Sequence, residues 1–308
     1  MRRKDFGRDL GLTIRMVFVG GLIALLYLAA AAVCVAFIFV EPRDWRAWLI
    51  APCFGVLVWA HYHSADRLLL RAVHGRVVSR REAPELHAIV ERLCDLADLP
   101  KPRIALVPSE APNAFAVGTS PGKTVVAVTD GLLERLEPRE IEAVLAHEIA
   151  HLVNRDGLVM TFASFFTLMG AALSRRRFAG RDFAAETPIT DFRDRVGFAI
   201  LKPFALALYG FSALLMLAIS RYREYAADRG AALVTGAPEE LMSALAKISD
   251  EMTRIPARDL RVAGVNAFFI IPAGMKKRRF ELLMDHPPLE KRLRELSEIA
   301  RELGRPVR

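Results

Sequence analysis

The sequence has few of the residues that build thiol-based metal or redox sites. Its 308 residues include three cysteines, Cys34, Cys53 and Cys94, and none is spaced for metal binding or for dithiol redox chemistry. Their apolar surroundings predict buried thiols in a reducing compartment. Because structural zinc sites usually take four protein ligands, frequently cysteine, this scarcity argues against a purely structural metal site.

Charged residues are missing from several long stretches of the chain. Residues 16–40 form an apolar run of about 25 residues, more than the roughly 20 that cross a bilayer and too many for the core of a cleaved signal peptide. Residues 47–65 are a second candidate with aromatic residues at both ends, although their uncharged part is only about 14 residues long. Residues 157–174 and 203–220 each have about 18 uncharged residues and enclose a polar insert at 175–197. We therefore expect an integral membrane protein with transmembrane helices.

The net charge of +8 comes largely from basic residues next to these apolar stretches. Arginines and lysines are frequent before residue 16 and between residues 67 and 81. Under the positive-inside rule, these two basic regions, which flank the first two apolar stretches, lie in the cytoplasm. Membrane orientation thus explains the basic residues better than nucleic-acid binding does. We expect the lipid bilayer, and no nucleic acid, as a partner.

Residues 139–156, REIEAVLAHEIAHLVNRD, carry the clearest chemical pattern. On a helix, side chains four residues apart project from one face, so His147 and His151 can bind one metal ion while Glu148 lies beside them. Pro138 fits the first turn of such a helix. Two neutral histidines and one further ligand leave an open position on Zn²⁺ for a water with a pKa of about 7, whose proton Glu148 can take.

The third ligand must come from another part of the chain. A metzincin would place a glycine and a third histidine shortly after His151, but Asn154 stands at the glycine position and no histidine follows at the required spacing, so that class is excluded. The best candidate lies in SRYREYAAD, residues 220–228, where a glutamate and an aspartate stand four apart on one helical face. The glutamate can bind metal while the aspartate accepts the free ring N–H of a ligating histidine. A solvated pair of carboxylates among arginines explains the same spacing.

Taken together, HEIAHLVNRD and SRYREYAAD resemble the M48 family of zinc metallopeptidases, and in particular its bacterial heat-shock membrane proteases. The resemblance covers nearly the whole chain, including PNAFAVG at residues 112–118 and HPP at residues 286–288. It implies one zinc ion per chain, a catalytic base and residues that support the ion. These are the ligands His147, His151 and Glu224, the base Glu148, and the supporting residues Asp228 and Asn154.

Between the apolar segments the sequence predicts a small α+β region. Residues 84–99 have the spacing of an amphipathic helix, and residues 103–107, 113–117 and 124–129 are typical of short strands. Zinc peptidases of this kind commonly bind substrate as an added strand at a sheet edge beside the metal helix. An interior strand fits residues 113–117 equally well, and the family resemblance favours the edge. The candidate substrate-binding residues are Asn113, Ala114, Phe115, Ala116 and Val117.

The C-terminal part predicts two amphipathic helices, at residues 235–250 and 287–303. Two prolines hold His286 at the start of the second helix. M48 enzymes have a late histidine near the metal, and this resemblance makes His286 a second catalytic candidate, with Arg292 supporting the cleft. A capping histidine and a surface arginine explain the same two residues.

These features predict a mainly helical α+β zincin of the gluzincin type, in which a small sheet lies beside the metal helix. Four regions are expected: a membrane anchor at 1–66, the two parts of a cytosolic catalytic domain at 67–156 and 221–308, and an apolar hairpin at 157–220. The resemblance implies a multi-pass zinc endopeptidase of the inner membrane. Its substrates would be misfolded or damaged membrane proteins, cleaved at the cytoplasmic face. A prenyl-protein protease of the same family, and a non-catalytic membrane protein with a structural zinc, are the alternatives.

Overall fold

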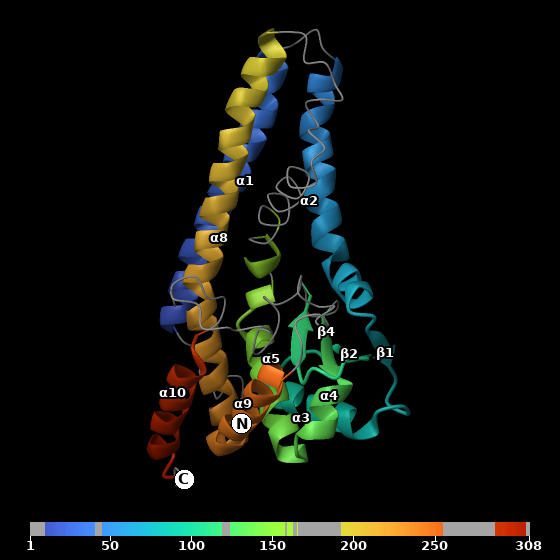
Figure 1. The fold of residues 1–308 in the computed structure, drawn as a ribbon, viewed down its shortest axis with the longest axis vertical. Helices are drawn as coiled ribbons and strands as arrows, with labels where there is room; N and C mark the ends of the chain where they lie inside the picture. Colours follow the sequence, from blue (N-terminus) through green and yellow to red (C-terminus); the bar gives the residue numbers. More distant parts are fainter. Residues whose placement is uncertain are drawn as a thin grey trace. The chain divides into compact units, whose positions relative to one another are not determined.

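The computed structural model describes residues 10–40, 45–118, 124–157, 159–162, 165, 192–254 and 287–305 (Figure 1). Contacts along the chain divide it into two compact units. The sheet unit comprises residues 1–16, 63–158 and 219–308, and the helical unit comprises residues 17–62 and 159–218. The described residues are mainly helical with one small sheet, as the sequence predicts.

The helical unit contains most of α1 (Leu10–Val40) and α2 (Trp45–Ala72) and the first part of α8 (Phe192–Thr235). Tyr27 of α1 donates a hydrogen bond from its Oη to the carbonyl oxygen of Phe162 at 3.0 Å, and Phe54 of α2 meets Phe165 edge to face. Phe162 and Phe165 therefore contact the N-terminal helices. Within the described residues, one helical segment, Thr13–Ala36, is long and apolar enough to cross a membrane.

The other expected membrane segments have different outcomes. Residues 47–65 and 203–220 are helical, within α2 and α8, whereas most of residues 157–174 lie outside the described residues. α8 runs without a break past residues 197 and 220, where the sequence suggested the ends of a polar insert and of a hairpin. A change from apolar to charged side chains marked those positions, but such a change does not by itself end a helix, and α8 continues through both Gly197 and Pro203.

The sheet has four strands in the order β1-β2-β4-β3. β2 (Arg103–Val107) and β4 (Val125–Thr129) pair in parallel, while β1 (Arg76–Val78) and β3 (Ala114–Val117) pair antiparallel with β2 and β4. The three predicted strands agree with β2, β3 and β4 to within one residue. The sequence did not predict β1, because three residues are too few to show alternation. In this sheet β3 lies at an edge.

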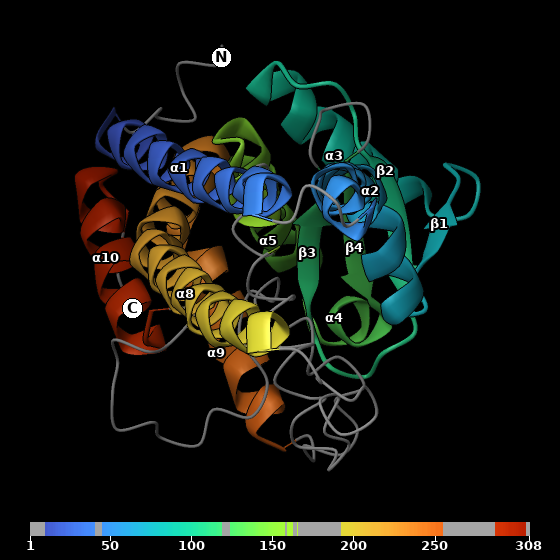
Figure 2. The same ribbon diagram turned by 90° about the horizontal axis from the view of Figure 1, so that it is seen from above.

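Several helices of the sheet unit pack beside the sheet or on one another (Figure 2). They are α3 (Pro84–Ala97), α4 (Asp130–Arg135), α5 (Pro138–Val153), α9 (Pro238–Arg254) and α10 (Leu289–Glu302). α5 lies beside β3, and α9 packs on α5. The helix expected at residues 235–250 begins instead at Pro238. Gly236 has a φ of 63°, and this left-handed conformation ends α8 just before it.

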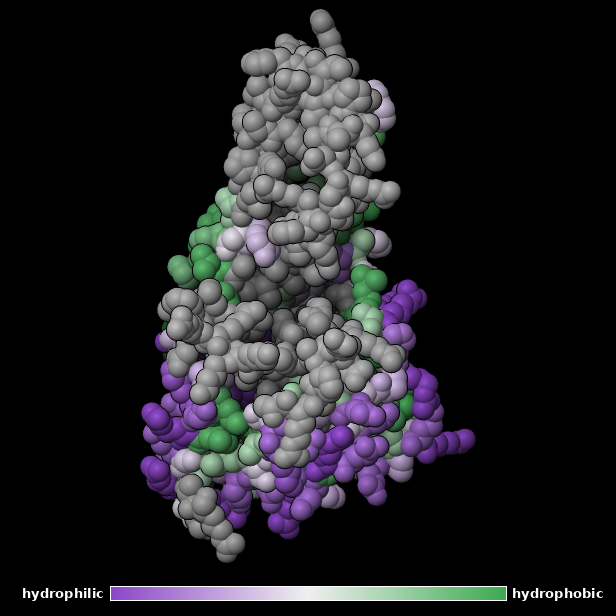
Figure 3. Space-filling view, in the orientation of Figure 1, coloured by the Kyte–Doolittle hydropathy of each residue, from purple (hydrophilic) through white to green (hydrophobic). Residues whose placement is uncertain are grey.

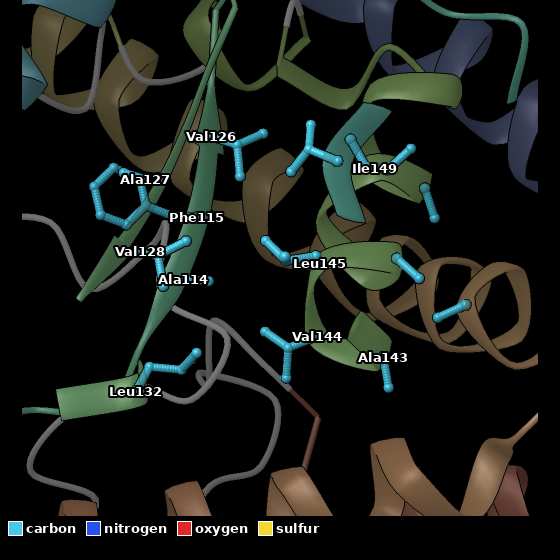
Figure 4. Close-up of a cluster of buried hydrophobic side chains, with 14 of the residues drawn as sticks. Ala114, Phe115, Val126, Ala127, Val128, Leu132, Ala143, Val144, Leu145 and Ile149 are labelled. Carbon is cyan, nitrogen blue, oxygen red and sulfur yellow. The ribbon is translucent and has the colours of Figure 1, made fainter. Parts of the chain in front are cut away.

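A buried apolar cluster fixes α5 against the sheet (Figure 4). Val126 and Val128 of β4 and Leu145 and Ile149 of α5 are all fully buried in it. Each such side chain contributes about 1.5–3 kcal/mol when removed from water. Glu137 and Glu140 also form a capping box at the start of α5. The packing and the cap together set the position and rotation of this helix, and so the direction of its opposite face.

Candidate metal centre

The two histidines of α5 and the glutamate of α8 converge on one point. The Nε2 atoms of His147 and His151 are 3.1 Å apart, and the carboxylate oxygens of Glu224 lie 3.6 and 3.7 Å from them. All three residues are buried. Two nitrogens bound tetrahedrally at about 2.0–2.1 Å from a zinc ion would be about 3.3 Å apart. The predicted ligand set therefore has the spacing that one metal ion requires.

An aspartate approaches the second nitrogen of each histidine ring. Asp228 Oδ1 lies 2.9 Å from Nδ1 of His147, as expected for the supporting carboxylate. Asp156 Oδ2 accepts a hydrogen bond from Nδ1 of His151 at 2.7 Å, a contact that the sequence did not reveal. A proton on each Nδ1 leaves the Nε2 lone pair free for a metal.

A buried arginine accompanies each aspartate. Arg223, from α8, donates from Nε to Asp156 at 3.0 Å. Arg292, from α10, donates to both oxygens of Asp228 at 2.6 and 2.8 Å and lies 3.3 Å from Glu224. Arg292 is 1% exposed, so the alternative of a surface arginine is wrong.

The charges of these buried groups fit a divalent cation. In the described part of the site, four buried carboxylates belong to Glu148, Asp156, Glu224 and Asp228, and two buried guanidinium groups belong to the arginines. With the carboxylates ionised and the histidines neutral, two negative charges remain. An excess of buried charge is costly unless it is paired or coordinates a metal. Both the donor atoms and the charge balance therefore suit a divalent metal ion.

Glu148 has the properties of a proton-transfer group. Burial raises the pKa of its carboxyl to about 7, although the neighbouring His147 and a hydrogen bond from the backbone of Ala116 act in the opposite direction. A carboxylate whose pKa lies near neutral pH can accept a proton and return it. Its bond to Ala116 also places this group directly beside β3.

The outer edge of β3 presents backbone groups next to Glu148. The carbonyl of Asn113 accepts a hydrogen bond from the N–H of Thr129, and the register pairs Ala114 with Val128 and Ala116 with Val126. Because hydrogen-bonded and non-bonded pairs alternate in an antiparallel ladder, Ala114 and Ala116 direct their N–H and C=O groups away from β4. The segment predicted for substrate binding thus lies at the metal helix.

A glycine allows the end of β3 to approach the turn after α5. A Cβ at Gly157 would lie 2.5 Å from the carbonyl oxygen of Gly118, closer than real contacts allow. Of the other predicted residues, Asn154 is the C-cap of α5, and its role stays a prediction. His286 lies outside the described residues.

A buried His–Glu–His cluster on α5, joined by a glutamate from α8 and flanked by the edge strand β3, has the donor set of a helical metallopeptidase. Residues 80–300 match Peptidase family M48, and the chain belongs to this family.

Similar proteins extend over nearly its whole length. The chain is 45% identical to "Protease HtpX homolog" of Moorella thermoacetica over 313 residues, which cover 98% of each chain. It is 42% identical to "Protease HtpX homolog 2" of Methanosarcina acetivorans over 305 residues, 99% of this chain and 100% of the relative. The expected likeness to the family's membrane proteases is thereby confirmed.

A solved structure has a similar fold. The crystal structure of S. mikatae Ste24p aligns with a TM-score of 0.50 at 20% identity, covering 94% of this chain and 66% of that one. At this identity the likeness concerns the fold alone.

Proposed function

We propose that this protein is a membrane-anchored zinc endopeptidase. The observation that carries the proposal is the convergence of two imidazole Nε2 atoms and the Glu224 carboxylate beside the buried carboxyl of Glu148. Three protein ligands instead of four are typical of a catalytic site, because the fourth position stays open to water or substrate. A zinc with only a structural role would need a further ligand.

Proton transfer in this site belongs to Glu148. When bound, a zinc ion supplies Lewis-acid polarisation of a carbonyl and lowers the pKa of water to about 7. Glu148 takes the proton of the attacking water and passes it to the nitrogen of the leaving amine. Arg292 holds Asp228 and Glu224 in place, and His286 stabilises the oxyanion of the tetrahedral state.

An extended peptide substrate pairs with the outer edge of β3. The outward N–H and C=O groups of Ala114 and the outward C=O of Ala116 provide the ladder, and residues 113–117 as a whole form the binding strand. Backbone pairing tolerates many sequences. This mode suits unfolded segments of damaged or misfolded membrane proteins, the substrates that we assign to the enzyme.

The enzyme acts at the cytoplasmic face of the inner membrane, and the chain crosses the membrane several times. Basic residues on either side of the first two apolar segments support this orientation. Reporter fusions after Arg15 and Arg81 should report the cytoplasm, and a fusion after Asp44 the outside. A cytoplasmic signal at Asp44 would refute this topology.

Substitution of the base tests the activity itself. Glu148→Gln should keep stoichiometric zinc and lose about 10²-fold or more of turnover, because the amide cannot accept the proton. The assay uses the full chain purified in detergent with an unfolded protein substrate, and a chelating hydroxamate should inhibit the wild type. Glu142→Gln, on the same helix but paired with Arg92 at the surface, is the control. Undiminished cleavage by Glu148→Gln would refute the assignment.

A further inference from the structure

The metal centre contains two parallel chains of polar contacts. In one chain His147 is followed by Asp228 and Arg292, and this aspartate was expected from its spacing to Glu224. In the other, His151 is followed by Asp156 and Arg223. The second chain has no counterpart in the sequence pattern, because its aspartate comes from the turn after α5.

Asp156 is placed for the metal centre more than for the stability of the fold. It is 0% exposed, and its Oδ2 accepts from both His151 and Arg223. Its Oδ1 has no hydrogen-bond partner among the described residues. A buried carboxylate oxygen without a partner is destabilising, and such a group in a folded protein calls for a functional explanation.

The backbone adopts an unusual conformation to bring Asp156 back to the helix. Arg155 has a φ of 58°, a left-handed value that is uncommon for a residue other than glycine. This turn follows directly on α5 and points the aspartate at His151. Arg223, the partner of the aspartate, immediately precedes the ligand Glu224 on α8. The contact therefore joins the two elements that supply all three ligands.

We propose that Asp156 and Arg223 are positioning residues of the metal centre. Asp156 fixes the tautomer and the ring plane of His151. Arg223 connects the Asp156 carboxylate to the part of α8 that carries Glu224. The inference rests on the proposed metal-dependent function. A carboxylate on the free nitrogen of a ligating histidine orients the ring and makes it a better donor. Arg223 acts on two ligands at once, through Asp156 on His151 and through the helix on Glu224.

Metal affinity and a spectrum test this inference independently of turnover. Asp156→Asn, Arg223→Gln and the double variant are compared as full-length proteins in detergent. Affinities for Zn²⁺ and Co²⁺ come from chelator competition, and the visible Co²⁺ spectrum reports ligand geometry. Asp66→Asn is the matched control, because Asp66 is also buried and bonded to an arginine, Arg103, at 2.8 Å within the sheet unit.

We expect Asp156→Asn to weaken metal binding by about 10 to 100-fold and to alter the Co²⁺ spectrum, while Asp66→Asn does neither. Arg223→Gln should change both in the same direction. The double variant should lose less than the product of the two single losses, because both residues act through one contact. Melting of the metal-free proteins separates this role from a purely structural one.

Two results would overturn the inference. One is wild-type affinity and an unchanged spectrum in both single variants; the other is a lower melting temperature of the metal-free proteins with unchanged metal affinity. A wild-type chain that binds Co²⁺ but not Zn²⁺ would refute zinc as the cofactor. The Co²⁺ affinities and spectra of the variants would then test the positioning role by themselves. A chain that binds neither ion would refute both.

Discussion

The two units of the molecule place their polar and apolar groups in opposite ways. The sheet unit buries four carboxylates and two arginines at the metal centre, and hydrophilic side chains cover much of its visible surface (Figure 3). The helical unit leaves large apolar side chains uncovered, among them Phe18 at 66%, Leu25 at 61% and Leu57 at 59% exposure. One unit is built for water around a polar site, whereas the exposed side of the other suits a lipid environment.

This difference separates two kinds of sequence requirement. At the metal centre, the proposed function depends on single contacts, such as the 2.7 Å hydrogen bond from Nδ1 of His151 to Asp156. On α1, exposed apolar residues contribute only to the average hydrophobicity of the segment. Substitutions that remove a similar number of atoms should therefore change metal binding and stability very differently in the two units.

The largest effect is expected at Glu224. Glu224→Ala should remove most of the bound zinc and with it the activity, because two histidines alone hold the ion poorly. Asp228→Asn should weaken zinc binding by only about 10 to 100-fold. Metal analysis of the purified variants measures both, with Glu142→Ala as the control. Stoichiometric zinc in Glu224→Ala would contradict the ligand set and show that another group supplies the third ligand.

A leucine-to-alanine pair compares the two units directly. Leu145 is fully buried in the core that holds α5, so Leu145→Ala should destabilise the sheet unit by about 2–5 kcal/mol. Leu25→Ala should leave that unfolding transition unchanged, because the side chain is exposed on α1. Denaturation followed by a probe in the sheet unit measures both. An equal decrease in the free energy of unfolding of the sheet unit in both variants would contradict this contrast between a buried and an exposed leucine.

Local spacing predicted the part of the site that lies on single helices. His147, Glu148 and His151 are within five residues of one another, and Glu224 and Asp228 are one turn apart. Helical periodicity alone places such groups on one face.

The rest of the site depends on tertiary structure. The position of Asp156 follows from a left-handed residue after α5, and the burial of Arg292 follows from the packing of α10 in the sheet unit. Neither feature has a periodic signature. The same reason explains β1, whose three residues form a strand only because β2 is available to pair with them.

The smallest effect concerns a partly buried ion pair outside the metal centre. Ser243 and Lys247 of α9 donate to Glu140 at the start of α5, at 2.6 and 2.8 Å. Burial alone would raise the pKa of Glu140, but the hydrogen bonds from Lys247, Ser243 and the backbone of Glu137 outweigh it and lower the pKa. Because the pKa is lowered, the ionised carboxylate stabilises the fold at any pH above its pKa in the unfolded chain, which is about 4.3. This stabilisation is lost as the pH falls through the pKa in the folded protein.

Lys247→Met should therefore destabilise the metal-free protein by about 1 kcal/mol at pH 7, a value reduced from that of a fully buried pair because the lysine is partly exposed. The difference from wild type should shrink as the pH falls through the lowered pKa of Glu140, because the carboxylate then becomes protonated in both proteins. Lys101→Met, which removes one of the two basic partners of the more exposed Glu91, is the control and should change stability less. Metal-free protein is required because protonation of the histidine ligands also releases metal at low pH. A difference that stays constant from pH 7 to pH 3 would show that Lys247 stabilises α9 by packing and not through the charge of Glu140.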